Sequence, residues 1–230
     1  MVRGMVMRIP LGLSDFRKLR REGYHYIDKS RQLGEVITWP SQVILLPRPR
    51  RFGKTLNLSL LRYFLERTPD EQKAERWSLF AGLEIASDPQ LRPHFGRYPV
   101  LALSFKDIKD PTWEGCLAST AALLAELYQE HDSLRPLLNQ AEAANFVDIQ
   151  MQRASPSVLM RSLHTLCRLL ARRHGESVVV LLDEYDTPLH TAHQQGYYDE
   201  ALSFYRTLLS VVLKDNVDLH KGVLTGVLRV

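Results

Sequence analysis

The sequence predicts an α/β fold in which a parallel β-sheet carries helices on both faces. Short apolar runs at 43–46, 100–105 and 178–182 have the length and composition of buried strands. Longer segments with apolar residues at helical spacing separate these runs. Strands that alternate with helices are typical of a parallel sheet, which binds ligands at the carboxyl ends of its strands.

The composition is that of a globular protein in a reducing compartment. The chain has 230 residues, 45% hydrophobic and 24% charged, enough for one large α/β domain. Its net charge of +4 permits an anionic ligand but does not by itself indicate nucleic-acid binding. Cys116 and Cys167 lie in apolar helical patterns and are expected to be buried thiols. Without a signal-peptide pattern or a membrane-length apolar run, we expect a cytoplasmic protein with no membrane contact.

The first 41 residues form a lead-in to the first strand. A helix is expected over 14–22 with Ser14 as N-cap, and another over 31–38. The alternating segment 24–28 between them predicts a short strand or extended chain.

Helical periodicity predicts further helices over 56–65, 70–80, 111–130, 155–174 and 199–213. Asp110 is expected to cap the helix that starts at Pro111, and Gly175 to end the one before the third strand. The polar segment 131–154 predicts a helical or loop insertion of unclear role.

A strand, a basic turn and a helix follow one another at the start of this core. The run 43–46 predicts a strand buried on both faces, and helical spacing from Leu56 places Lys54 and Thr55 in the first helical turn. Free backbone N–H groups and the helix dipole attract anions there. A strand, a turn and a helix N-terminus in this order form the kind of site that binds a nucleoside triphosphate.

The turn matches the phosphate-binding motif G-x-x-x-x-G-K-[ST] except that Arg48 replaces the first glycine. Lys54 would reach the β- and γ-phosphates, and the Thr55 hydroxyl would ligate Mg²⁺. The alternative is an ordinary strand–turn–helix whose arginines are solvated. The nucleotide-contacting residues that we predict are Arg50, Arg51, Phe52, Gly53, Lys54, Thr55 and Leu56.

Carboxylates follow the third apolar run directly. Asp183 would orient Mg²⁺, usually through its waters, opposite Thr55, and Glu184 would polarise the water that attacks the γ-phosphate. The alternative is a strand that ends in a solvated acidic turn. Asp186 is a weaker candidate, either a turn cap or a supporting carboxylate.

A fourth strand is expected over 222–230. In ATPases that use a carboxylate to activate water, an additional strand lies between the Lys-Thr strand and the acidic strand, with a polar residue near the γ-phosphate. Thr225 fits that sensor role, although a core strand with a polar interruption explains it nearly as well. Arg229 would either reach phosphate or lie on the surface.

Together these motifs resemble the AAA-ATPase-like family of mostly prokaryotic proteins, in which a P-loop domain is commonly followed by a restriction-endonuclease-like nuclease domain. The R-P-R-R-F-G-K-[ST] turn is far more specific than a bare Walker A motif and accounts for Arg48. The segments that carry the resemblance are 9–16, 26–30, 48–55, 180–186 and 224–229.

The resemblance implies a Walker A motif at 53–55, a Walker B motif at 183–184 and a sensor-like strand at Thr225. Leu228 departs from the family's Thr-Gly-Val-Ser-Arg pattern, where serine is usual. The chain also ends at Val230, where relatives continue, so we expect a C-terminally truncated P-loop domain whose fourth strand could lie at an exposed edge.

We therefore expect a P-loop NTPase domain at 42–230, with the lead-in 1–41 packed on it. It would bind ATP and Mg²⁺, and hydrolyse ATP to drive a conformational switch. The expected catalytic residues are Glu184, Lys54 and Thr225, and the expected metal ligands are Thr55 and Asp183.

The alternatives are a nucleotide-binding or interaction module that does not hydrolyse ATP, or a P-loop kinase. A nucleic-acid or protein partner follows only from the resemblance, and the sequence predicts no oligomeric state.

Overall fold

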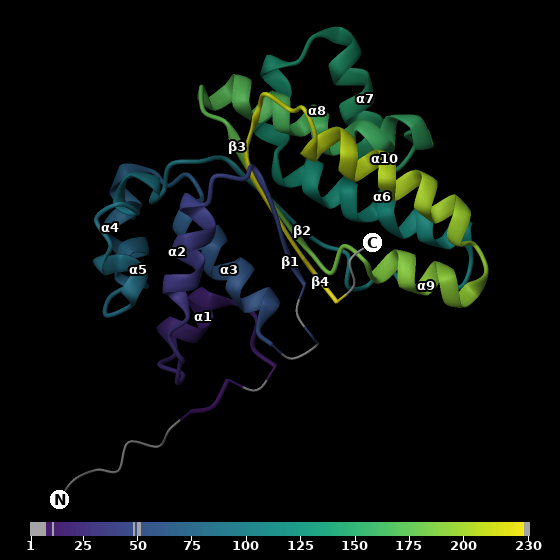
Figure 1. Ribbon diagram of the computed structural model, residues 1–230. Helices are drawn as coiled ribbons and strands as arrows, with labels where there is room; N and C mark the ends of the chain where they lie inside the picture. Colours follow the sequence, from purple (N-terminus) through teal and green to yellow (C-terminus); the bar gives the residue numbers. More distant parts are fainter. Residues whose placement is uncertain (1–7, 11, 48, 50–51, 228–230) are drawn as a thin grey trace, which may run out of the picture. The chain divides into compact units, whose positions relative to one another are not determined.

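The computed structural model forms two compact units, each assembled from two separate stretches of the chain (Figure 1). Unit 1 combines the residues up to 41 with 50–100, and unit 2 combines 42–49 with 101–230. The residues that the structure describes are 8–10, 12–47, 49 and 52–227.

Unit 2 contains a four-stranded parallel sheet flanked by helices, as the sequence predicts. The strand order is β1-β4-β3-β2. The strands are β1 (Val43–Pro47), β2 (Val100–Ser104, which begins at the boundary between the units), β3 (Val178–Asp183) and β4 (Leu219–Gly226). The fourth strand lies between β1 and β3, which confirms the expected insertion between the Lys-Thr strand and the acidic strand.

The alternative expectation, that the fourth strand lies at an exposed edge, is wrong, because the edge strand beside it is β1. The prediction that β1 is buried on both faces is also wrong: Val43 and Leu45 are 36% and 37% exposed. An edge strand has one hydrogen-bonded neighbour in the sheet and leaves more of its side chains in solvent. Every residue of β3, in contrast, is buried between two neighbouring strands.

The core of unit 2 lies between the sheet and a layer of helices. Alternate residues of β3, namely Val178, Val180 and Leu182, pack into a cluster with apolar residues of α6, α8 and α10, which lie beside the sheet in Figure 1. The helices of this unit are α6 (Trp113–Glu130), α7 (Gln140–Gln150), α8 (Pro156–His174), α9 (Thr187–Gln195) and α10 (Tyr198–Leu213), with a 3₁₀ turn η2 (Asp132–Leu137).

Two of these helices differ from the prediction. The N-cap of α6 is Thr112, whose hydroxyl accepts a hydrogen bond from the Gly115 N–H at 3.2 Å, whereas the carboxylate of Asp110 accepts one from the Ser119 hydroxyl at 3.1 Å. The sequence analysis also missed α9, which is short and polar on its exposed side. The polar insertion contains α7, which opens with a capping box between Asn139 and Glu142.

Unit 1 is helical and packs around an aromatic cluster. The rings of Phe64, Phe80 and Phe95 meet edge to face, with Trp77 and Phe16 against them. Its elements are α1 (Phe16–Arg21), α2 (Ser30–Thr38), α3 (Lys54–Leu65), α4 (Asp70–Ser78), α5 (Glu84–Ser87) and a 3₁₀ turn η1 (Arg92–His94). Among the described residues of the whole chain, no helix is both long and apolar enough to cross a membrane.

The lead-in helix α1 is shorter than predicted. Its N-cap is Asp15 rather than Ser14, because the Asp15 carboxylate accepts a hydrogen bond from the Lys18 N–H at 2.6 Å. The segment 24–28 has no regular secondary structure, so the predicted short strand is absent there. The Asp28 carboxylate accepts hydrogen bonds from the backbone N–H groups of Ser30 and Glu84, each at 2.8 Å, so it connects the starts of α2 and α5.

Candidate functional site

The carboxyl ends of β3 and β4 bring two predicted site residues together. Asp183 is the last residue of β3 and lies in register with Thr225 of β4. The Thr225 hydroxyl donates a hydrogen bond to Asp183 Oδ1 at 2.5 Å, and the two residues are only 3% and 2% exposed. Parallel pairing puts both side chains at the edge of the sheet where α/β proteins bind ligands.

A buried carboxylate at this edge fits a hard cation. Mg²⁺ prefers oxygen ligands and keeps several of its waters, so one or two protein oxygens are enough to hold it beside phosphates. No group of three or more His, Cys, Asp or Glu side chains in the described part of the chain is placed to hold a metal by itself. A carboxylate such as that of Asp183 is the kind of oxygen ligand that Mg²⁺ takes from a protein.

Glu184 adopts an uncommon backbone conformation directly after the strand. Its φ of 50° lies in the left-handed region, which non-glycine residues rarely occupy. Its side chain is half-buried, and its Oε2 accepts a hydrogen bond from the Thr187 hydroxyl at 3.2 Å. Backbone strain of this kind clusters at active sites, where the surrounding fold holds the residue in place.

Asp186 secures the end of β4. Its Oδ2 accepts a hydrogen bond from the Val227 N–H at 2.8 Å, and it is 5% exposed. At Gly226 an added Cβ would lie 2.6 Å from Asp186 Oδ1 and 2.8 Å from a ring carbon of Tyr185, so only glycine fits without displacing them. Asp186 is the N-cap residue of α9, although its side chain makes no cap hydrogen bond to that helix. A role as a supporting carboxylate stays a prediction.

The phosphate-turn residues open α3 in unit 1. The helix begins at Lys54 as predicted, and its N-cap Gly53 has φ 72° and ψ 24°, a left-handed conformation that glycine adopts without steric cost. Lys54 is 8% exposed, Thr55 and Leu56 are half-buried, and Phe52 is 57% exposed. The candidate residues Arg48, Arg50, Arg51, Leu228 and Arg229 lie outside the described residues.

The candidate residues thus form two sets in different units. Lys54 and Thr55 belong to unit 1, whereas Asp183, Glu184 and Thr225 belong to unit 2. β1 precedes the turn, and its last residue, Pro47, pairs with Gly226 one position beyond Thr225. β1 therefore ends at the same carboxyl end of the sheet as β3 and Asp183.

Comparison with known proteins assigns the family. Residues 10–230 match a family described as "Predicted AAA-ATPase". The chain belongs to the AAA-ATPase-like family. One relative is an "Uncharacterized protein in vnfD 5'region" of Azotobacter chroococcum mcd 1, 29% identical over 227 residues. The match covers 96% of this chain and 37% of that protein, so the chain spans little more than a third of the relative's length. No solved structure matches the chain.

Family membership confirms the resemblance on which the sequence analysis relied. It supports a nucleotide-binding, ATPase-like role, and the parallel sheet flanked by helices is consistent with a P-loop NTPase fold. The family also implies a divalent metal beside the nucleotide, and the chemistry of the Asp183 carboxylate fits one.

Sequence reasoning missed Thr187 as a partner of Glu184 and Gly226 as a packing requirement. In the sequence Thr187 stands out only as part of a Thr-Pro pair. Its hydroxyl reaches Glu184 because α9 begins at Thr187, three residues further along the chain. Gly226 was visible as part of the Thr-Gly-Val motif, but its need for space depends on Tyr185 and Asp186 across the strand pair.

Proposed function

We propose that this member of the AAA-ATPase-like family binds ATP with Mg²⁺ and hydrolyses it to drive a conformational switch. The observation that carries the proposal is the buried pair of Asp183 and Thr225 at the carboxyl edge of the sheet, followed at once by the strained Glu184. In this proposal Asp183 is the carboxylate for the metal and Glu184 a separate carboxylate for the attacking water.

The start of α3 is proposed to bind the phosphates. Gly53 lets the chain turn into the helix so that its first N–H groups point outward, and Lys54 neutralises phosphate charge. The Thr55 hydroxyl and the Asp183 carboxylate would hold Mg²⁺, which neutralises charge on the β- and γ-phosphate oxygens. Arg50 and Arg51 are proposed to add positive charge to the same region.

Glu184 is proposed as the group that accepts a proton from the attacking water. Thr187 donates a hydrogen bond to its Oε2, which restricts the rotation of the carboxylate. The proton of the Thr225 hydroxyl is already committed to Asp183, and we therefore propose that Thr225 acts mainly by orienting that carboxylate.

An Mg²⁺-dependent ATP titration with phosphate release followed on the same sample tests the proposal. Lys54→Ala should weaken ATP binding by about a hundredfold, the loss of roughly 3 kcal/mol of charge-assisted contact. Glu184→Gln should keep ATP binding and lose turnover. Lys18→Ala, which removes an exposed lysine of α1, is the matched control and should change neither.

Two results would contradict the proposal at different points. Equal ATP affinity in the wild-type protein and Lys54→Ala would exclude the nucleotide site at the start of α3. ATP binding without Mg²⁺-dependent phosphate release would exclude hydrolysis and favour the non-hydrolysing module, while transfer of phosphate to a small molecule would favour the kinase.

A further inference from the structure

Positive charge is concentrated in unit 1. Its sequence contains 17 Lys and Arg residues against 10 Asp and Glu residues, a formal net charge of +7. Unit 2 contains 13 against 16, a net charge of −3. The mild overall charge therefore conceals a basic unit, whose field attracts anions independently of the sheet and its carboxylates.

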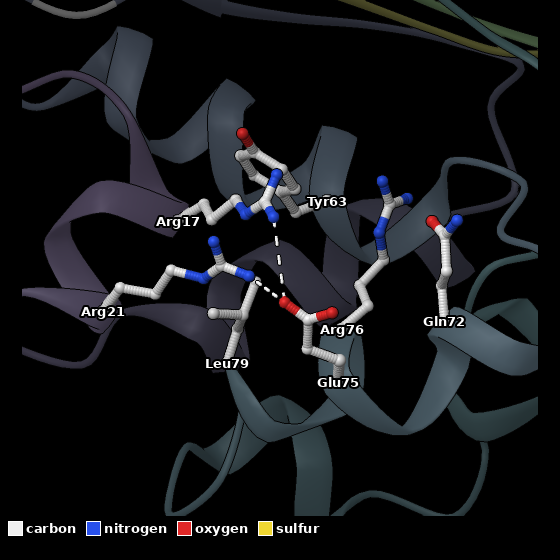
Figure 2. A pocket seen from close by; sticks show the side chains of 7 residues that line it. All are labelled: Arg17, Arg21, Tyr63, Gln72, Glu75, Arg76 and Leu79. Carbon is white, nitrogen blue, oxygen red and sulfur yellow. Dashed lines mark hydrogen bonds and ion pairs between the residues drawn. The ribbon is translucent and has the colours of Figure 1, made fainter.

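A small pocket of about 50 Å³ in unit 1 is lined by arginines from two helices. Arg17 and Arg21 come from α1, and Gln72, Glu75 and Arg76 from α4 (Figure 2). Tyr63 of α3 and Leu79 complete the wall. The volume suits a small group such as a phosphate rather than a nucleoside, because one water molecule already needs about 10–15 Å³ of such space.

Two guanidinium groups of this pocket share one carboxylate. Figure 2 shows Arg17 and Arg21 pointing to the same oxygen of Glu75, Oε1. One carboxylate therefore faces two cations. The Arg17–Glu75 distance is 3.8 Å, longer than a hydrogen bond.

Two further polar side chains of the pocket, those of Arg76 and Tyr63, are held in place by other contacts. Arg76 donates to the Glu66 carboxylate at 3.1 Å and to the Glu66 carbonyl at 2.8 Å, which orients the third guanidinium of the pocket. The Tyr63 hydroxyl donates to the Asp15 carboxylate at 3.0 Å, and burial raises the pKa of Tyr63, so the phenol stays protonated at physiological pH. Positive charge in the pocket therefore comes from side chains that are already positioned.

We propose that this α1–α4 pocket binds a phosphate group through Arg17 and Arg21, which Glu75 occupies when no ligand is present. Guanidinium forks match phosphate oxygens and bind them with charge-assisted hydrogen bonds. Glu75 is 63% exposed on its side chain, so it can rotate into solvent when phosphate enters. Exposed ion pairs contribute only about 0–1 kcal/mol each, and displacing Glu75 therefore costs little.

The site is tested by titrating the full chain with inorganic phosphate while the ¹H–¹⁵N signals of arginine Nε–H groups are followed by NMR. Saturable shifts of the Arg17 and Arg21 signals are expected. Arg17→Gln and Arg21→Gln should each weaken binding about tenfold, and Glu75→Gln should strengthen it a few-fold. Arg31→Gln, on the exposed side of α2, is the matched control and should leave the affinity unchanged.

The titration is repeated in the Lys54→Ala variant, which separates this pocket from the proposed nucleotide site. Persistence of the Arg17 and Arg21 shifts in that variant supports the pocket. The absence of shifts in both backgrounds, or the same phosphate affinity in Arg21→Gln as in Arg31→Gln, would overturn it. Preserved arginine signals elsewhere in each spectrum show that the variant is folded.

Competition identifies the source of the phosphate group. A single-stranded oligonucleotide without terminal phosphates offers only phosphodiesters, whereas inorganic phosphate resembles a free phosphate or a phosphomonoester. Displacement by the oligonucleotide would assign the pocket to a nucleic-acid backbone. In that case the affinity for the oligonucleotide should fall steeply with added salt. Displacement by phosphomonoesters alone would assign it to a small phosphorylated ligand.

Discussion

Replacing Glu184 with glycine should give a more stable protein than replacing it with alanine. Both changes remove the carboxylate and its hydrogen bond from Thr187, but only glycine relieves the left-handed backbone at φ 50°. That conformation costs an L-residue about 1–2 kcal/mol, while glycine loses about 0.5–1 kcal/mol more chain entropy on folding. The glycine variant should therefore exceed the alanine variant by about 0.5–1 kcal/mol in free energy of unfolding.

Urea unfolding followed by circular dichroism measures this difference as a shift in midpoint at constant slope. Gln152, with φ 55° and an exposed side chain, is a matched position outside the site. There too the glycine variant should have a higher free energy of unfolding than the alanine variant, by a similar amount. Glu126, exposed in the middle of α6, is the opposite control: there glycine should be less stable than alanine by about 1 kcal/mol.

A contrary result is that the alanine variant is the more stable one at Glu184 while the variants at Gln152 behave as expected. That result would mean that residue 184 carries no backbone strain. Both Glu184 variants should also lack ATP turnover, because neither keeps a carboxylate to accept the proton of water.

Three further results are expected. Thr225→Val, which removes the donor to buried Asp183, should lower the free energy of unfolding by about 1.5–3 kcal/mol in urea, and Thr225→Ser should restore most of it. Thr187→Val should lower ATP turnover several-fold without changing ATP affinity, and Thr187→Ser should rescue it; unchanged turnover would remove Thr187 from the mechanism. Burial raises the pKa of Cys167 to about 12, so the folded state keeps a proton that the unfolded state loses above about pH 9. The free energy of unfolding should therefore fall between about pH 9 and pH 12, with a shallower slope in Cys167→Ala; an identical slope would contradict this assignment.

Local patterns predicted the elements that depend on local interactions. The apolar run of β3 specifies a buried strand. A glycine with a free backbone marks the start of α3, and a proline in the first turn marks the start of α8. Prediction was weaker where two nearby groups compete for one role. Both Asp110 and Thr112 have side chains that can cap α6, and the contact of Asp110 with Ser119 leaves Thr112 as the cap.

The sequence by itself determined the order of strands and helices along the chain, the motifs at 53–55 and 183–184, and the family to which they point. The place of β4 between β1 and β3 was expected by analogy with other ATPases, and the tertiary structure established it, because strand order depends on pairing between residues far apart in sequence. That pairing brings Thr225 to Asp183, leaves β1 at the edge of the sheet and leaves no room for a Cβ at Gly226 unless Asp186 and Tyr185 shift. Helix packing likewise brings Arg17 and Arg21 to Glu75, more than fifty residues away, and no local pattern records such a contact.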